Sequence, residues 1–110
     1  MNDIEVYTVE QVPGHKVSKV IGIVRGNSVR TRHVGKDILA GLRNLVGGEV
    51  HEYTKLMAES REQAIDRMCD EARMLGANAV VGVRFETSMI ASMAAELLAF
   101  GTAVVMEKEG

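Results

Sequence analysis

The sequence is poor in several residue types, and each shortage removes a class of protein. Its 110 residues include one cysteine, one proline, two Phe, two Tyr and no Trp. The single cysteine, Cys69, can form neither an intrachain disulfide nor a Cys-x-x-Cys zinc site. With so few rings to stack on a base or a sugar, the core must be built from Val, Ile, Leu, Met and Ala. We therefore expect an aliphatic core and a reducing, cytoplasmic setting.

Clustered positive charge is also scarce. The formal net charge is -2 and the sequence pI is about 5.9. Because a surface that neutralises phosphates needs grouped Lys and Arg, these values argue against nucleic acid as a partner. The one basic group is short, and we interpret it as a solvated strand face. Its members are Arg25, Arg30, Arg32 and Lys36.

Signals for export or membrane insertion are missing too. The N-terminus MNDIEVYTVE has acidic residues where a signal peptide is basic, so we expect no secretory signal. The most apolar stretch, Met89 to Met106, is close to the length of a membrane span but contains Glu96 and strand-forming residues. We interpret it as core or interface and expect no membrane partner.

The chain length fits one domain, residues 1–110, in which residues 1–15 are an N-terminal lead-in that ends near Pro13. From Val17 to Val34 two β-rich runs flank Gly26-Asn27, a pair suited to the positive φ of a tight turn. This pattern predicts a β-hairpin.

Two helices are predicted next. Residues 36–46 have apolar side chains at helical spacing, and Gly47-Gly48 would end this short helix. Residues 51–75 predict one long amphipathic helix closed by Gly76. Its apolar stripe comprises Tyr53, Met57, Ala64, Met68, Ala72 and Leu75. The opposite arc comprises Glu52, Lys55, Glu59, Glu62, Asp66, Asp70 and Arg73.

The final third completes a sheet. Val81, Val83, Phe85 and Met89 alternate with polar residues or glycine, which predicts a strand with one buried face. Residues 96–108 are apolar on both faces, so their second face needs a cover, for which a neighbouring subunit is the simplest candidate. The elements together predict an α+β fold, with an antiparallel sheet packed against one long helix plus a short helix.

Four segments occur in a recognisable order between Lys16 and Val105: VGKDILAGLRNLVGGEVHEYTKLM, SREQAIDRM, LGANAVVGV and AFGTAVV. This series resembles the YbjQ family, small bacterial and archaeal proteins often labelled heavy-metal-binding. The resemblance implies a dodecin-like subunit and a ring-forming homo-oligomer, a pentamer. The positions that carry it are Asp37, Arg43, Gly47, Gly48, Tyr53, Arg61, Ala64, Gly76, Ala77, Gly82, Gly101 and Thr102. Many relatives have Arg after the glycine pair, where this chain has Glu49.

A divalent or soft metal ion is the cofactor that the resemblance implies. A soft-metal site needs converging thiolate and imidazole ligands, yet no two of the candidates lie within five residues of each other. The candidates are His15, His33, His51 and Cys69. On one helix His51 and Cys69 would be about 27 Å apart, so His51 is a candidate ligand only across subunits. We interpret the carboxylate ladder of the long helix as a solvated face and not as a hard-metal site.

Other chemistry is weakly supported. The glycine pair near Glu49 and Glu52 lacks a phosphate-loop pattern, and no serine or cysteine has the surroundings of a nucleophile. The first hypothesis is therefore a homo-oligomeric binding or scaffold protein without enzymatic activity. The alternative is an enzyme or cofactor-binding protein whose site lies at the subunit interface. Its candidate residues are Asp37, Arg43, Tyr53 and Arg61.

Overall fold

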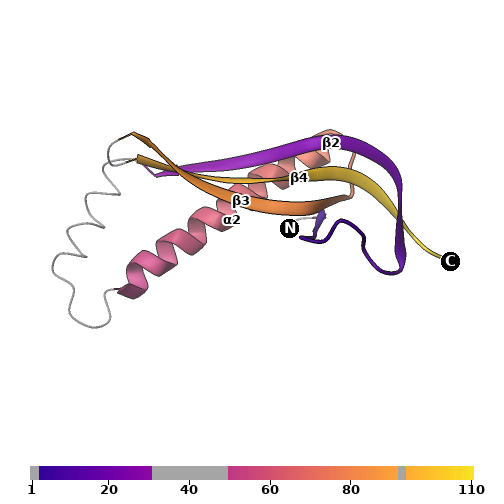
Figure 1. Cartoon of the computed structure of the whole chain (residues 1–110), viewed down its shortest axis with the longest axis horizontal. Coiled ribbons are helices and arrows are strands. Elements are labelled where there is room, and N and C mark those ends of the chain that lie inside the picture. The colour runs from indigo at the N-terminus through magenta and orange to yellow at the C-terminus, as the bar shows by residue number, and fades with distance from the viewer. Residues whose placement is uncertain (1–2, 31–49, 92–93) are drawn as a thin grey trace.

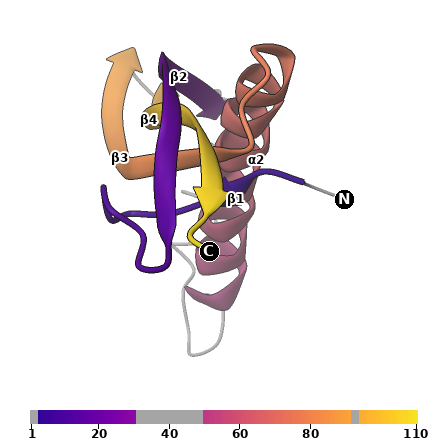
Figure 2. The same ribbon diagram turned by 90° about the vertical axis from the view of Figure 1, so that its right-hand side faces the viewer.

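One helix packs on a four-stranded sheet in the computed structural model, which describes residues 3–30, 50–91 and 94–110. The elements are β1 (Glu5–Val6), β2 (His15–Arg30), α2 (Val50–Met74), β3 (Ala79–Ala91) and β4 (Ala94–Lys108). Figure 1 shows the long strands running side by side with α2 crossing them, and Figure 2 shows α2 as a second layer on one side of the strands. The predicted α+β class is confirmed. The predicted short helix lies outside the described residues.

The sheet is mixed, with strand order β1-β3-β4-β2. β4 pairs antiparallel with β2 and with β3, but β1 pairs parallel with β3 through Glu5–Ala79 and Val6–Val80, so the predicted wholly antiparallel sheet is wrong. The prediction missed β1 because it treated residues 1–15 as a lead-in. Ile4, in that segment, is only 6 % exposed and belongs to the main core.

Gly26-Asn27 lies inside a continuous strand, so the predicted hairpin is wrong. In β2, Gly26 is opposite Ala99 of β4 and Asn27 is opposite Leu98. The glycine is needed for close approach of the helix: a Cβ at Gly26 would lie 2.2 Å from the carbonyl oxygen of Ala64. Glycine in a strand therefore marks contact with another backbone here, not a turn.

Two β-bulges place apolar residues of β2 at a spacing of three on one face of the sheet. Val17, Val20 and Ile23 are opposite Met106, Val104 and Thr102 of β4, with register shifts between Val17 and Lys19 and between Val20 and Gly22. Each bulge adds one residue to β2, so alternate positions of β4 meet every third position of β2. All three side chains consequently lie on the face opposite α2.

A third bulge changes which face the β3 side chains occupy. Val80 and Val83 belong to the core cluster under α2, whereas Val81 belongs to a separate cluster on the other face. The register shift between Val81 and Arg84 accounts for this difference, so the predicted alternation of Val81 with Val83 on one buried face is wrong. Phe85, predicted to be buried, is 42 % exposed.

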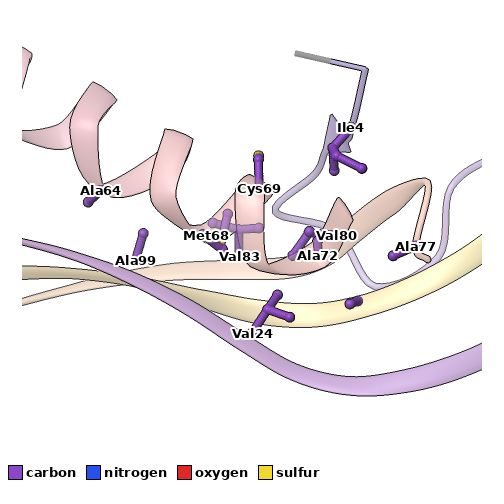
Figure 3. Packing of buried hydrophobic residues seen from close by; sticks show 11 residues of the cluster. Ile4, Val24, Ala64, Met68, Cys69, Ala72, Ala77, Val80, Val83 and Ala99 are labelled. Atoms are coloured by element: carbon purple, nitrogen blue, oxygen red, sulfur yellow. The ribbon is translucent and has the colours of Figure 1, made fainter. Parts of the chain in front are cut away.

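The buried stripe of α2 agrees with the prediction at its centre. Ala64, Met68 and Ala72 are each 0 % exposed and point toward strand residues that include Val24 and Ala99 (Figure 3). The predicted member Leu75 is instead 52 % exposed, because it follows the last helical turn.

The end of the helix follows the prediction for Gly76. Gly76 has a φ of 87°. The amide of Gly76 donates to the carbonyl of Arg73 at 3.1 Å, and that of Ala77 donates to the carbonyl of Ala72 at 3.0 Å. These two bonds are the Schellman pattern of a helix C-terminus. Within the described ranges, no helix combines the length and apolar character needed to cross a membrane.

The second face of the sheet is partly covered by the chain itself. Tyr7 and Val12 of the N-terminal segment pack on a buried cluster there. The cluster comprises Ala79, Val81, Val104 and Met106. The expectation that a neighbouring subunit covers all of the apolar second face of β4 therefore needs correction: residues 7–12 cover one end of it.

The side chain of Asn78, which precedes β3, forms two hydrogen bonds with the backbone of Met106 in β4. These bonds resemble those between paired strand residues. The Nδ2 of Asn78 donates to the carbonyl of Met106 at 2.9 Å, and the Met106 amide donates to the Asn78 Oδ1 at 2.8 Å. We expect Asn78→Ala to lower the free energy of unfolding by about 1–3 kcal/mol, because both part-buried Met106 groups lose a partner. Urea unfolding measures this loss. Asn78→Asp replaces the donating nitrogen with an oxygen that faces the Met106 carbonyl, so it should not restore the parent midpoint. An unchanged midpoint for Asn78→Ala would contradict the bridging role.

Candidate functional site

Beyond the N-terminal cover, the sheet face opposite α2 carries exposed apolar side chains. Val20 is 65 % exposed, Ile23 is 68 % exposed and Val29 is 40 % exposed. Leu98 and Phe100 of β4 are half-buried on the same face. We call these five residues the open sheet face. Neighbouring apolar side chains left open to water on one face mark a surface that interacts with something else.

The strand pairings show what borders the open sheet face. Ile23 lies opposite Thr102, whose other neighbour is the buried Val81, so the exposed residue is next to the N-terminal cover. Further along, Arg25 and Arg84 flank Phe100 on either side. The open sheet face is thus an apolar surface that continues into the buried cluster around Val81 and Val104, which the N-terminal segment covers. The guanidinium groups of Arg25 and Arg84 border it.

The charged groups of this face are partly engaged. The Nη1 of Arg84 donates to the carbonyl of Thr8 at 2.9 Å, which fixes the N-terminal segment against β3. Asn27 Nδ2 donates to Glu96 Oε2 at 3.0 Å. The Arg25 side chain is exposed and forms no ion pair within the described residues. Arg25 therefore places a positive charge near Ile23 on this side of the sheet.

Of the four residues predicted for an interface site, only Arg61 has a described side chain. Asp37 and Arg43 lie outside the described residues, and Tyr53 is in α2 but its side chain is not described. Arg61 is described and is exposed. The neighbouring Ser60 is the buried residue at that turn, at 1 % exposure. Convergence of the four side chains stays a prediction.

The metal candidates do not come together in the part of the chain that is described. His33 lies outside it, and His51 is in α2 with an undescribed side chain. Cys69 is 0 % exposed within the aliphatic core, and His15 Nδ1 lies 3.2 Å from the carbonyl oxygen of Pro13. Among the described side chains, no three His, Cys, Asp or Glu residues form a group that could hold a metal ion. The described side chains therefore do not fit a heavy-metal centre by themselves.

A polar hollow lies beside the N-terminal segment, near the C-terminal end of β4. Its volume is about 420 Å³, and its lining includes Asp3, Glu5, His15 and Lys108. Asp3 already binds the Nε of Arg73 at 2.7 Å, and that hydrogen bond lowers the pKa of the Asp3 carboxyl. The same bond, followed by the bond to Asp70, raises the pKa of Arg73. The ion pair attaches the N-terminal segment to the end of α2 and leaves Asp3 engaged, so this hollow is a weaker candidate site than the open sheet face.

The described fold and the open sheet face define a class of small α+β domain with one long helix and an apolar sheet surface. The chain belongs to the YbjQ family: a family model described as "Putative heavy-metal-binding" matches residues 4–107. The chain is 55 % identical over 105 residues to a UPF0145 protein of Thermus thermophilus, covering 96 % of this chain and 92 % of that protein. It is 57 % identical over 106 residues to a UPF0145 protein of Thermococcus kodakarensis, with coverage of 96 % and 94 %.

A solved structure has a similar fold. It is the crystal structure of a protein of unknown function, of the DUF74 family, from Pediococcus pentosaceus. The TM-score is 0.63 at 12 % sequence identity, and the match covers 94 % of this chain and 98 % of that chain. At this identity the likeness concerns the fold alone.

Proposed function

We propose that this protein is a homo-oligomeric scaffold or binding protein whose subunits meet through the open sheet face. The observation that carries the proposal is the exposure of Ile23, at 68 %, and Val20, at 65 %, on adjoining positions of one sheet face. Burying one such aliphatic side chain stabilises an assembly by about 1.5–3 kcal/mol. Two per subunit, with Leu98 and Phe100 beside them, offer a sizeable driving force for association.

The occupant we propose is a second copy of the chain, in a ring. Support comes from β4, whose residues 97–106 are apolar on both faces although the N-terminal segment covers only one end of the second face. The resemblance to the YbjQ family supplies the dodecin-like ring and the number five, which we adopt for the proposal. The lone cysteine, buried and unable to form an intrachain disulfide, is compatible with a cytoplasmic setting.

Light scattering on the purified protein tests the assembly. We expect a stable mass that is a multiple of the 12.0 kDa chain across micromolar concentrations, because each copy buries its open sheet face against another. A stable mass of one chain at these concentrations would reject the proposal.

The ligand part of the proposal is a soft or divalent metal ion, as the family description suggests. His51 is the candidate ligand, and it would act only with a group from another subunit because the described part of its own chain contains no metal-binding cluster. Equilibrium dialysis against zinc, copper and cadmium tests this part. Retention that His51→Ala removes from an intact oligomer would support it, and lack of retention would leave scaffolding as the function.

A further inference from the structure

A ring of more than two copies needs two different surfaces on each chain. In a cyclic assembly each subunit contacts its neighbours through a head-to-tail interface, whereas one self-complementary patch gives a two-fold dimer. The open sheet face is therefore only half of the interface in the proposed ring. The other half must be another exposed surface, and apolar side chains away from that face are the natural place to search.

The end of α2 provides such a surface. Met74 is 87 % exposed, the highest value among the large apolar side chains that the structure describes, and the adjoining Leu75 is 52 % exposed. They lie at the C-terminal end of the helix, which packs on the opposite side of the sheet from Ile23. Methionine is unbranched and adapts to an irregular apolar surface, which suits a docking residue.

Charge also favours the end of α2 over a second sheet face as the partner. On this side of the sheet, Arg25 of β2 and Arg84 of β3 flank Phe100, near Ile23. A contact between two copies of this face would bring these guanidinium groups together, which destabilises pairing. The last turns of α2 carry Asp70, Glu71 and Arg73, and Asp3 pairs with Arg73, so that end of the helix is net negative. A helix end of this kind complements the two guanidinium groups beside Phe100.

We infer that subunits join head to tail, with Met74 and Leu75 of one copy packed on Val20 and Ile23 of the next. This inference rests on the self-assembly proposed above. It identifies the end of α2 as the second surface of the subunit interface. Arg25, next to Ile23, would meet the acidic surroundings of the helix end. Because the two surfaces lie on different sides of the subunit, each copy offers one to each neighbour, and a closed ring follows when the rotation between copies closes.

Thiol cross-linking tests the contact. Ile23→Cys and Met74→Cys are combined in one chain in a Cys69→Ala background, and the protein is treated with a short bis-maleimide and run on a denaturing gel. We expect a ladder of covalent species beyond the dimer, because every neighbouring pair places the thiol introduced in β2 of one copy against the thiol introduced at the end of α2 of the other. Each single-cysteine chain is the control and should give no covalent oligomer.

The outcomes separate this contact from the assembly itself. An oligomer by light scattering whose double variant gives no ladder would overturn the head-to-tail contact but keep self-assembly. Covalent dimers from the Ile23→Cys chain alone would replace it with face-to-face pairing. A monomer by light scattering would remove both proposals. As an independent measurement, Met74→Glu should reduce the oligomer mass, whereas Gln11→Glu, an equal charge change at an exposed loop position, should not.

Discussion

Replacing Gly26 with alanine is expected to lower the free energy of unfolding by about 3 kcal/mol or more, the upper part of the range for overpacked sites. The added Cβ would lie 2.2 Å from the Ala64 oxygen and 2.3 Å from the Met68 nitrogen. Both are backbone atoms of α2, so no side-chain rotation can relieve the overlap. The helix would have to move off the sheet.

The contacts on either side of Gly26 make that movement expensive. The backbone amide of Arg25 donates to Glu71 Oε1 at 3.2 Å, and the Arg67 guanidinium donates to the carbonyl of Asn27. Ser28 Oγ donates to Gln63 Oε1 at 2.9 Å in a part-buried position. A displaced helix would lengthen all of these bonds, so strain at Gly26 is not absorbed locally.

Chemical denaturation of Gly26→Ala gives the measurement, and two other glycines give the controls. Gly110→Ala meets no atom within 4 Å and should leave stability unchanged. Gly76→Ala also meets no atom but has a φ of 87°, so it should lose only about 1–2 kcal/mol from the left-handed backbone. A Gly26→Ala protein as stable as the parent would show that the helix does not lie this close to β2.

Introducing a charge at Ile23 is the second large expected effect, and it acts on assembly. We expect Ile23→Glu to weaken association by about 100-fold or more, because an unpaired carboxylate would be desolvated in the interface. The subunit itself should keep its stability, since Ile23 is 68 % exposed in the single chain. Sedimentation velocity measures the change in mass, and thermal unfolding monitored by circular dichroism checks the fold.

Two control variants test whether the loss of mass is specific to the open sheet face or follows from altering any exposed apolar residue. Val9→Glu alters a side chain that is 50 % exposed in the N-terminal segment, outside the open sheet face, and should leave the mass unchanged. Gln11→Glu controls for the added charge. If Ile23→Glu retained the parent mass, the open sheet face would not be the contact surface.

The parts of the fold with regular periodicity could be predicted from the sequence. The long helix and the centre of its buried stripe follow from apolar residues at helical spacing, and the strand at 94–108 follows from its apolar run. Ile4 and Val6, alternating with Asp3 and Glu5, were also a strand signal. This run is too short to distinguish a strand from an irregular lead-in, and only two residues of β1 form the pairing.

The remaining features depend on contacts that no local pattern encodes. Gly26-Asn27 has turn chemistry, yet Gly26 is glycine because the backbone of α2 approaches it. Val17, Val20 and Ile23 do not alternate, and only the two bulges in β2 align them on one face. The open sheet face therefore emerges from tertiary structure. For the interface site, Asp37, Arg43 and the side chain of Tyr53 lie outside the described parts of the chain, so their convergence stays a prediction.

Native mass spectrometry of protein purified without added metal is the sharpest test of self-assembly, because it counts the copies and detects any retained ion together. We expect a discrete assembly of five copies of the 12.0 kDa chain, and we expect Ile23→Glu to reduce it to smaller species. A spectrum containing only the 12.0 kDa chain at micromolar concentration would contradict self-assembly.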